Sequence, residues 1–420
     1  MKPFLNYETI FTKINYFLII FLPISLLIGS LISNITVVLI CLIFIFDLIL
    51  RKDNFFFKDK NFYFLTFIYF YLILNSLFLP DNNTESLTRA IGFIRFIFLS
   101  YAIFYYFIFF KDKILKYWFI IFVIVSIDIL YEYIFGKNIF GFYAQYPGRI
   151  ASFTGDELKI GGYYFGFFGL VLFYVLRKYS KFLFYLISIS FLIISVLIGE
   201  KSNFIKICIL LFILNYFFLN KKEIKIFFLI FVLGIFISII ININNNLRTS
   251  FLGDLPIIKH TRVIISAVYP KLVSEDKYKY ENTFKEQIYS LRYYGHYYTA
   301  YEIFKKNYLF GAGLKNFRYE SYKKEYKLGG LFGGSTHPHQ VHFELLSELG
   351  LVGYLLILFN IIFNLFRQKQ NSNNLKFVAT SFILSTFVPL LPSGSFFTSY
   401  GATIFFINYS FLIFHKLDNK

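Results

Sequence analysis

Residues 182–199 read FLFYLISISFLIISVLIG, a run of 18 residues that contains no charged side chain. A helix of about 20 mainly apolar residues is long enough to cross the hydrocarbon core of a bilayer. Backbone groups in lipid must satisfy their own hydrogen bonds, so a run of this kind should be helical. Lys181 precedes the run, and Glu200 and Lys201 follow it. The stretch therefore predicts a transmembrane helix.

Similar apolar runs recur along the whole chain. Hydrophobic residues make up 57% of the sequence and charged residues only 16%, whereas about a quarter of a soluble domain is charged. We therefore predict an all-α fold, a polytopic transmembrane bundle of about 12 helices. The helices are expected near 14–32, 34–50, 61–79, 89–110, 116–136, 160–176, 181–199, 202–219, 225–243, 347–366, 374–391 and 397–415.

The distribution of Lys and Arg predicts the orientation, because cytoplasmic loops carry an excess of these residues. If the N-terminus is cytoplasmic, the short inside loops hold 16 Lys and Arg, and the short outside segments hold 4. Both termini are then cytoplasmic. The formal net charge of +18 lies largely in these loops, so we predict no nucleic-acid partner.

The longest connection between apolar runs, 244–346, is expected outside the cytoplasm. It divides the chain into transmembrane helices with rim loops (1–243), a cap (244–346) and a final group of helices (347–420). Five of the six His fall in the connection: His260, His296, His337, His339 and His342. A structureless connection of this length would be unusual, so we expect a mainly helical cap that carries function.

One stretch leads from this connection into the tenth predicted helix. Residues 335–350 read STHPHQVHFELLSELG, and helical spacing would place His339, Phe343 and Leu346 on one face. A His at the membrane boundary can accept a proton from an attacking hydroxyl near pH 7. His339 is our first candidate for this base and His337 the second.

Two other interpretations of the stretch stay open. The histidines can cap the helix or lie at the interface without chemistry. His337, His339 and His342 can also ligate zinc, although their spacing lacks the i, i+4 pair of a helical metalloprotease motif. We predict no metal and no cofactor.

Several cations lie where topology does not require them. Arg292 can bind a phosphate through two parallel hydrogen bonds, and His296 is close to it in sequence. Lys201 and Arg149 lie in predicted outside loops, and Arg95 falls within a predicted helix, where an arginine should face the bundle interior. Each also has a structural interpretation, as a solvated loop cation or as one partner of an ion pair.

Several motifs resemble those of the O-antigen ligase and O-antigen polymerase superfamily. Residues 337–340 (His-Pro-His-Gln) with 343–353 resemble its His-Pro-His-Asn/Gln stretch and Glu-x-Gly-x-x-Gly helix. Residues 308–317 (YLFGAGLKNF) resemble its Pro-Leu-x-Gly-x-Gly-x-x-Asn-Phe motif. Residues 149–162 resemble its rim loop, and 199–202 resemble its Gly-Glu/Ser-Arg-Ser/Thr motif, with Lys201 in place of Arg.

The resemblance implies a metal-independent glycosyltransferase of the bacterial inner membrane, with the large loop in the periplasm. Its members move a glycan from an undecaprenyl-diphosphate carrier to lipid A–core or to a second carrier-linked glycan. By this resemblance His339 would activate the acceptor, and Arg292, His296, Lys201, Arg149 and Arg95 would bind the donor. The motifs favour a ligase over a polymerase. A twelve-helix transporter or flippase, or a scaffolding protein, is a less favoured alternative, because no internal repeat is visible.

Overall fold

The computed structural model describes residues 10–80, 83–144, 146, 148–155, 159–218, 293–326, 334–367 and 374–413. Within these ranges all regular structure is helical. Eight helical spans are long and apolar enough to cross a membrane, which confirms the predicted all-α, multi-pass fold. The predicted helix 225–243 lies outside the described residues.

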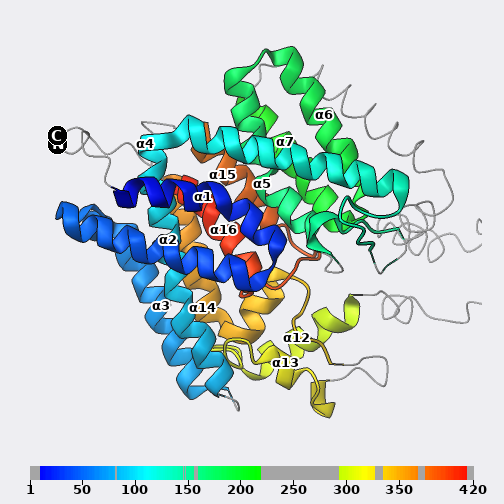
Figure 1. Ribbon diagram of the computed structural model, residues 1–420. Helices are drawn as coiled ribbons and strands as arrows, with labels where there is room; N and C mark the ends of the chain where they lie inside the picture. Colours follow the sequence, from blue (N-terminus) through cyan, green and yellow to red (C-terminus); the bar gives the residue numbers. More distant parts are fainter. Residues whose placement is uncertain are drawn as a thin grey trace, which may run out of the picture.

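The helices form one bundle around a shared apolar core (Figure 1). Their bounds are α1 (Ile10–Ile28), α2 (Ser30–Arg51), α3 (Lys60–Phe78), α4 (Asn83–Phe135), α5 (Ile160–Lys178), α6 (Lys181–Leu197), α7 (Lys201–Phe218), α14 (Val341–Phe366), α15 (Asn374–Thr386) and α16 (Ser399–Leu412).

Residues 293–326, which lie within the long connection, form a small helical structure that we call the cap from here on. It contains α12 (Tyr294–Lys306) and α13 (Phe317–Glu320). Its own apolar core is closed by Phe343 from α14. In Figure 1 these helices, in yellow, lie beside the first part of α14. We call this end of the bundle the cap face.

One helix, α4, replaces two predicted ones. It spans 53 residues and continues through the predicted loop 111–116. A straight helix of this length would measure about 80 Å, more than twice the roughly 30 Å hydrocarbon core. Two apolar spans, Thr84–Phe110 and Asp112–Phe135, meet at its middle. The two predicted crossings are therefore present, but no loop separates them.

Contacts place the start of α4 against the cap and its second half against α5. Glu85, near its start, forms an ion pair with the cap. Asp112, near its middle, lies 3.3 Å from Arg177 at the end of α5. Further along, the hydroxyls of Ser126 and Tyr164 lie 3.1 Å apart, near the start of α5. The second half of α4 thus runs antiparallel to α5.

The first part of α14 is interrupted at Gly350, whose φ of 65° and ψ of −171° are not helical. In an unbroken helix the amides of Leu351 and Val352 would donate to the carbonyls of Ser347 and Glu348. The cap segment 308–313 is inserted between these groups and satisfies all four. The bonds are Ala312 N to Ser347 O (2.9 Å), Gly313 N to Glu348 O (3.0 Å), Leu351 N to Tyr308 O (2.8 Å) and Val352 N to Leu309 O (3.0 Å).

Candidate active site

Three imidazoles come together where the cap meets the start of α14. The ring centroids of His337 and His339 are 4.0 Å apart, and His296 on α12 lies 4.7 Å from His339. Tyr293 adds an aromatic ring 5.5 Å from His339. The structure therefore brings together three of the predicted site residues, His296, His337 and His339, which we call the histidine cluster.

The backbone around His339 is held in an unusual conformation. Its φ is 58°, in the left-handed region that costs energy for a residue with a Cβ. The carbonyl of His339 accepts a hydrogen bond from Ser393 N at 2.8 Å. Gln340 then caps α14, since its side chain accepts from Phe343 N at 3.0 Å. The predicted helical face through His339 and Phe343 is wrong, because the helix begins after Gln340.

A buried ionic group lies behind the cluster. Lys315 Nζ is 3.4 Å from Glu344 Oε1, and both side chains are almost fully buried. Glu344 Oε2 accepts from Phe396 N at 2.8 Å, and Glu348 Oε2 accepts from Lys315 N at 2.9 Å. Buried charges require such partners. The group ties the cap, α14 and the loop before α16 into one support for the histidines.

Two other predicted ligands lie at the ends of α5, α6 and α7. Arg149 Nη1 is 3.7 Å from Glu200 Oε1, and Asn203 also donates to Glu200. Ile150 N donates to Ile198 O at 3.3 Å, which aligns the two rim segments. Lys201 follows directly as the first residue of α7. We call Arg149, Glu200, Lys201 and Asn203 the rim group.

The histidine cluster and the rim group lie at the two ends of one short segment, 393–400. Ser393 binds His339 at its beginning. At its end, Tyr400 OH donates to Lys159 O at 2.9 Å. The Tyr400 ring lies against Gly162, and the adjacent Gly161 packs against Glu200 and Asn203 of the rim group. This segment therefore connects the two groups along the cap face.

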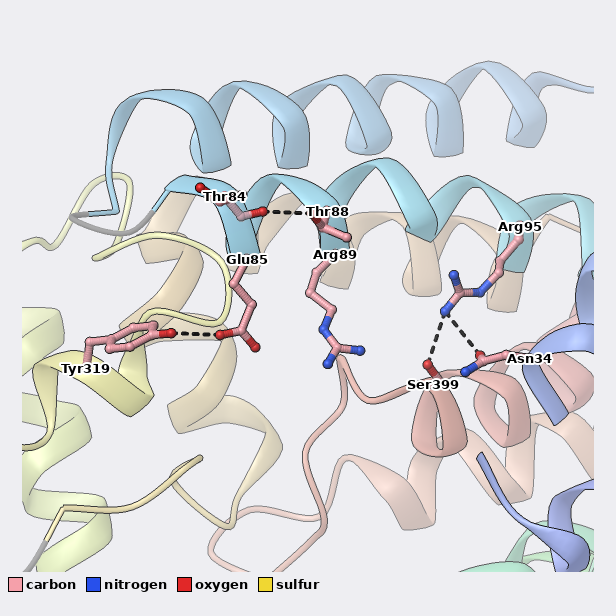
Figure 2. Close-up of a pocket in the computed structure, with 8 residues that line it drawn as sticks. All are labelled: Asn34, Thr84, Glu85, Thr88, Arg89, Arg95, Tyr319 and Ser399. Carbon is pink, nitrogen blue, oxygen red and sulfur yellow. Dashed lines mark hydrogen bonds between the residues drawn. The ribbon is translucent and has the colours of Figure 1, made fainter. Parts of the chain in front are cut away.

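Arg95 lies in a third place, a pocket at the cap-face end of α4 (Figure 2). Its guanidinium donates to Ser399 Oγ at 3.1 Å and to Asn34 Oδ1 at 3.3 Å. Arg292 and His260 lie outside the described residues.

His342 is directed away from the other histidines. Its Nδ1 is 3.0 Å from Tyr354 OH, and its Nε2 is 2.9 Å from Phe387 O. In the ranges that the structure describes, no three His, Cys, Asp or Glu side chains are arranged to hold a metal ion. The proposed zinc set of His337, His339 and His342 is thus not assembled.

Comparison with protein families adds to this geometry. Residues 186–358 match the family described as O-antigen ligase. The matched segment is similar to the O-antigen ligase family over these residues. It contains the histidine cluster, Lys201, and the interlocked segments 308–313 and 347–352. No curated protein matched the chain. The match supports a similarity to glycosyltransferases of the O-antigen ligase and polymerase type.

His337 holds a proton poorly in the folded protein. Burial, then the charges of His339, Lys315, His296 and Arg318, lower the pKa of His337 to about 3. Its Nε2 is buried with no hydrogen-bond partner among the described residues, and its Nδ1 lies 3.0 Å from Thr336 Oγ1. An imidazole this acidic stays neutral and is a weak base.

This low pKa predicts an acid-sensitive fold. In the unfolded chain His337 binds a proton below about pH 6.5, whereas in the folded protein it stays neutral down to about pH 3. Stability should therefore fall as the pH is lowered through this window, by at most about 2 kcal/mol between pH 6.5 and 5. His337→Gln should reduce the loss in melting temperature over that range. An unchanged loss would show that His337 does not titrate in this way.

Several residues of this site were missed by the sequence reasoning. Lys315 lies within the 308–317 motif and Arg318 follows it directly, yet their partners Glu344 and Glu85 are distant in sequence. The only available signal was the motif itself, which contains Lys315. Spacing along the chain does not reveal that this lysine is buried against α14.

Proposed function

We propose that this protein transfers a glycan from undecaprenyl diphosphate to an acceptor hydroxyl at the periplasmic face of the bacterial inner membrane. Lipid A–core is the proposed acceptor. The observation that carries the proposal is the histidine cluster within the segment that matches the O-antigen ligase family, at the membrane end where the cap meets the bundle.

His339 is the proposed general base. It is half-buried beside His296 and His337, and its backbone is held by Ser393. The low pKa of His337 makes that residue a poor proton acceptor, so we assign the role to His339. The neutral imidazole of His337 would then orient His339 and form a hydrogen bond with the substrate.

The reaction needs one bond to form and one to break. The acceptor oxygen attacks the anomeric carbon of the donor sugar while its proton passes to His339. The bond from that carbon to the diphosphate oxygen breaks, and undecaprenyl diphosphate leaves with the electron pair. Because diphosphate is a good leaving group, positioning and charge stabilisation account for most of the catalysis.

Cations of the cap face would bind the diphosphate. Arg149 and Lys201 in the rim group and His296 in the cluster are candidates, together with Arg292 from the predicted loop. Arg149 shares Glu200 with Asn203, so its guanidinium is already oriented before a ligand arrives. Lys201 offers a point charge, where arginine would offer a planar fork.

The test is transfer by the purified full chain. The protein in nanodiscs would receive a glycan linked to undecaprenyl diphosphate, with either lipid A–core or a second carrier-linked glycan as acceptor, each with and without chelator. We expect product on lipid A–core and no effect of chelator. Product only on the carrier-linked acceptor would indicate a polymerase, and no product on either would contradict the proposal.

A further inference from the structure

The pocket at the cap-face end of α4 is a second place where the protein can hold an anion. Its volume is about 510 Å³, within the roughly 300–1,000 Å³ of small-molecule sites. Helices α2, α4 and α16 and the cap contribute its walls (Figure 2). The lining residues are Asn34, Thr84, Glu85, Thr88, Arg89, Arg95, Tyr319 and Ser399.

The acid in this lining is already used by the cap. Arg318 Nη1 lies 2.7 Å from Glu85 Oε1, and Tyr319 OH donates to Glu85 Oε2 at 2.8 Å. The carboxylate is therefore directed to α13, and Figure 2 shows it on the Tyr319 side of the pocket. It is not available to neutralise the two arginines.

Both arginines of the pocket lack an anionic partner within the described part of the chain. Arg95 bonds only the neutral groups of Asn34 and Ser399 and lies 4.7 Å over the Phe96 ring. Its Nε is buried with no hydrogen-bond partner among the described residues. Arg89 is exposed, and in Figure 2 its guanidinium extends into the pocket. Unpaired cations at membrane depth are costly and usually functional.

The hydrogen-bond donors that line the pocket match a phosphate group. A guanidinium presents parallel N–H donors that match phosphate oxygens, and the Ser399 hydroxyl, which accepts from Arg95, can supply a further donor. The pocket also borders lipid-facing surface. Ile91 is one helical turn from Arg95, and Leu31 and Val38 flank Asn34 at helical spacing; all three apolar side chains are exposed. An acyl chain can lie on this surface while its head group reaches the arginines.

We propose that this pocket binds the phosphate-bearing head group of a lipid, at a site separate from the histidine cluster. Ser399 connects the two sites, since it ends the segment that begins with Ser393 at His339. The site is open between cap and bundle, so a bound head group contacts both. This inference is independent of the proposed glycan transfer, because binding is measured with no glycan present.

The test is lipid binding by the full chain in detergent, measured by native mass spectrometry. The probes are phosphatidic acid, diacylglycerol with the same acyl chains, and inorganic phosphate. We expect phosphatidic acid to bind at least tenfold more tightly than either of the others. Arg89→Gln should lower that affinity roughly tenfold. Arg177→Gln, at the opposite end of the bundle beside Asp112, is the matched control and should bind normally.

A second variant covers the case in which loss of charge affects folding. Arg95→Lys keeps the charge but loses the planar fork, so it should weaken phosphatidic acid binding while the melting temperature stays close to that of the parent. Equal affinity for diacylglycerol, or unchanged binding by both arginine variants, would overturn the site. Inorganic phosphate binding as tightly as phosphatidic acid, with the same dependence on Arg89, would overturn its assignment to a lipid.

Discussion

His339→Ala should abolish glycan transfer while leaving the protein folded. A positioned general base contributes roughly 10²–10⁴-fold to a reaction of this kind, and the turnover rate should fall by that factor. The side chain is only half-buried, and the backbone bond from Ser393 does not involve the imidazole. The measurement is single-turnover transfer from a carrier-linked glycan, normalised to folded protein.

His342→Gln provides the matched control for this variant. His342 lies three residues away in sequence, but its ring is bound to Tyr354 and to the carbonyl of Phe387. Its loss should lower the melting temperature and leave the rate per folded molecule unchanged. If His339→Ala retained the full rate, or if His342→Gln lost as much, the role of His339 as the base would have to be abandoned.

The pH dependence of glycan transfer by His337→Gln can show whether His337 or His339 is the base. Because the pKa of His337 is lowered to about 3, its protonation cannot produce a loss of activity between pH 5 and 7. In His337→Gln the rate of glycan transfer should therefore fall toward low pH in the same way as in the parent protein, even if the rate is lower at every pH.

The membrane spans could be predicted from sequence because an uninterrupted apolar run has few structures open to it in lipid. The run expected at 34–50 is an example, and α2 (Ser30–Arg51) occupies it, whereas the run at 182–199 forms α6, a shorter apolar helix of 17 residues. The loop expected at 111–116 contains Lys111, Asp112 and Lys113, yet the chain stays helical there. Charge alone does not stop a helix, because the backbone bonds can form in either medium.

The sequence named candidate residues for the site but not their geometry. The spacing of His337 and His339 suggested chemistry, and His296 was named only as a neighbour of Arg292. Their convergence depends on how α12 docks against α14, a contact between segments about 40 residues apart in the chain. The positive φ of His339 also depends on a distant partner, Ser393. Local patterns carry no information on either contact.

Gly311→Ala is expected to destabilise the protein strongly. Gly311 has φ +75°, and an added Cβ would overlap the backbone of Glu348 and Gly350. Neither backbone can move without breaking the hydrogen bonds that bridge the interruption of α14. Left-handed strain costs about 1–2 kcal/mol and overpacking about 1–3 kcal/mol more.

Comparison with Gly136→Ala isolates the cost of overpacking. Gly136 has almost the same φ, +73°, but an added Cβ there would meet nothing within 4 Å. Both variants bear the strain, whereas only Gly311→Ala bears the collision. Thermal unfolding of the two purified proteins should therefore show a small loss in melting temperature for Gly136→Ala and a clearly larger one for Gly311→Ala. Equal losses would mean that segment 308–313 does not need its close approach to α14, and that the cap is held by other contacts.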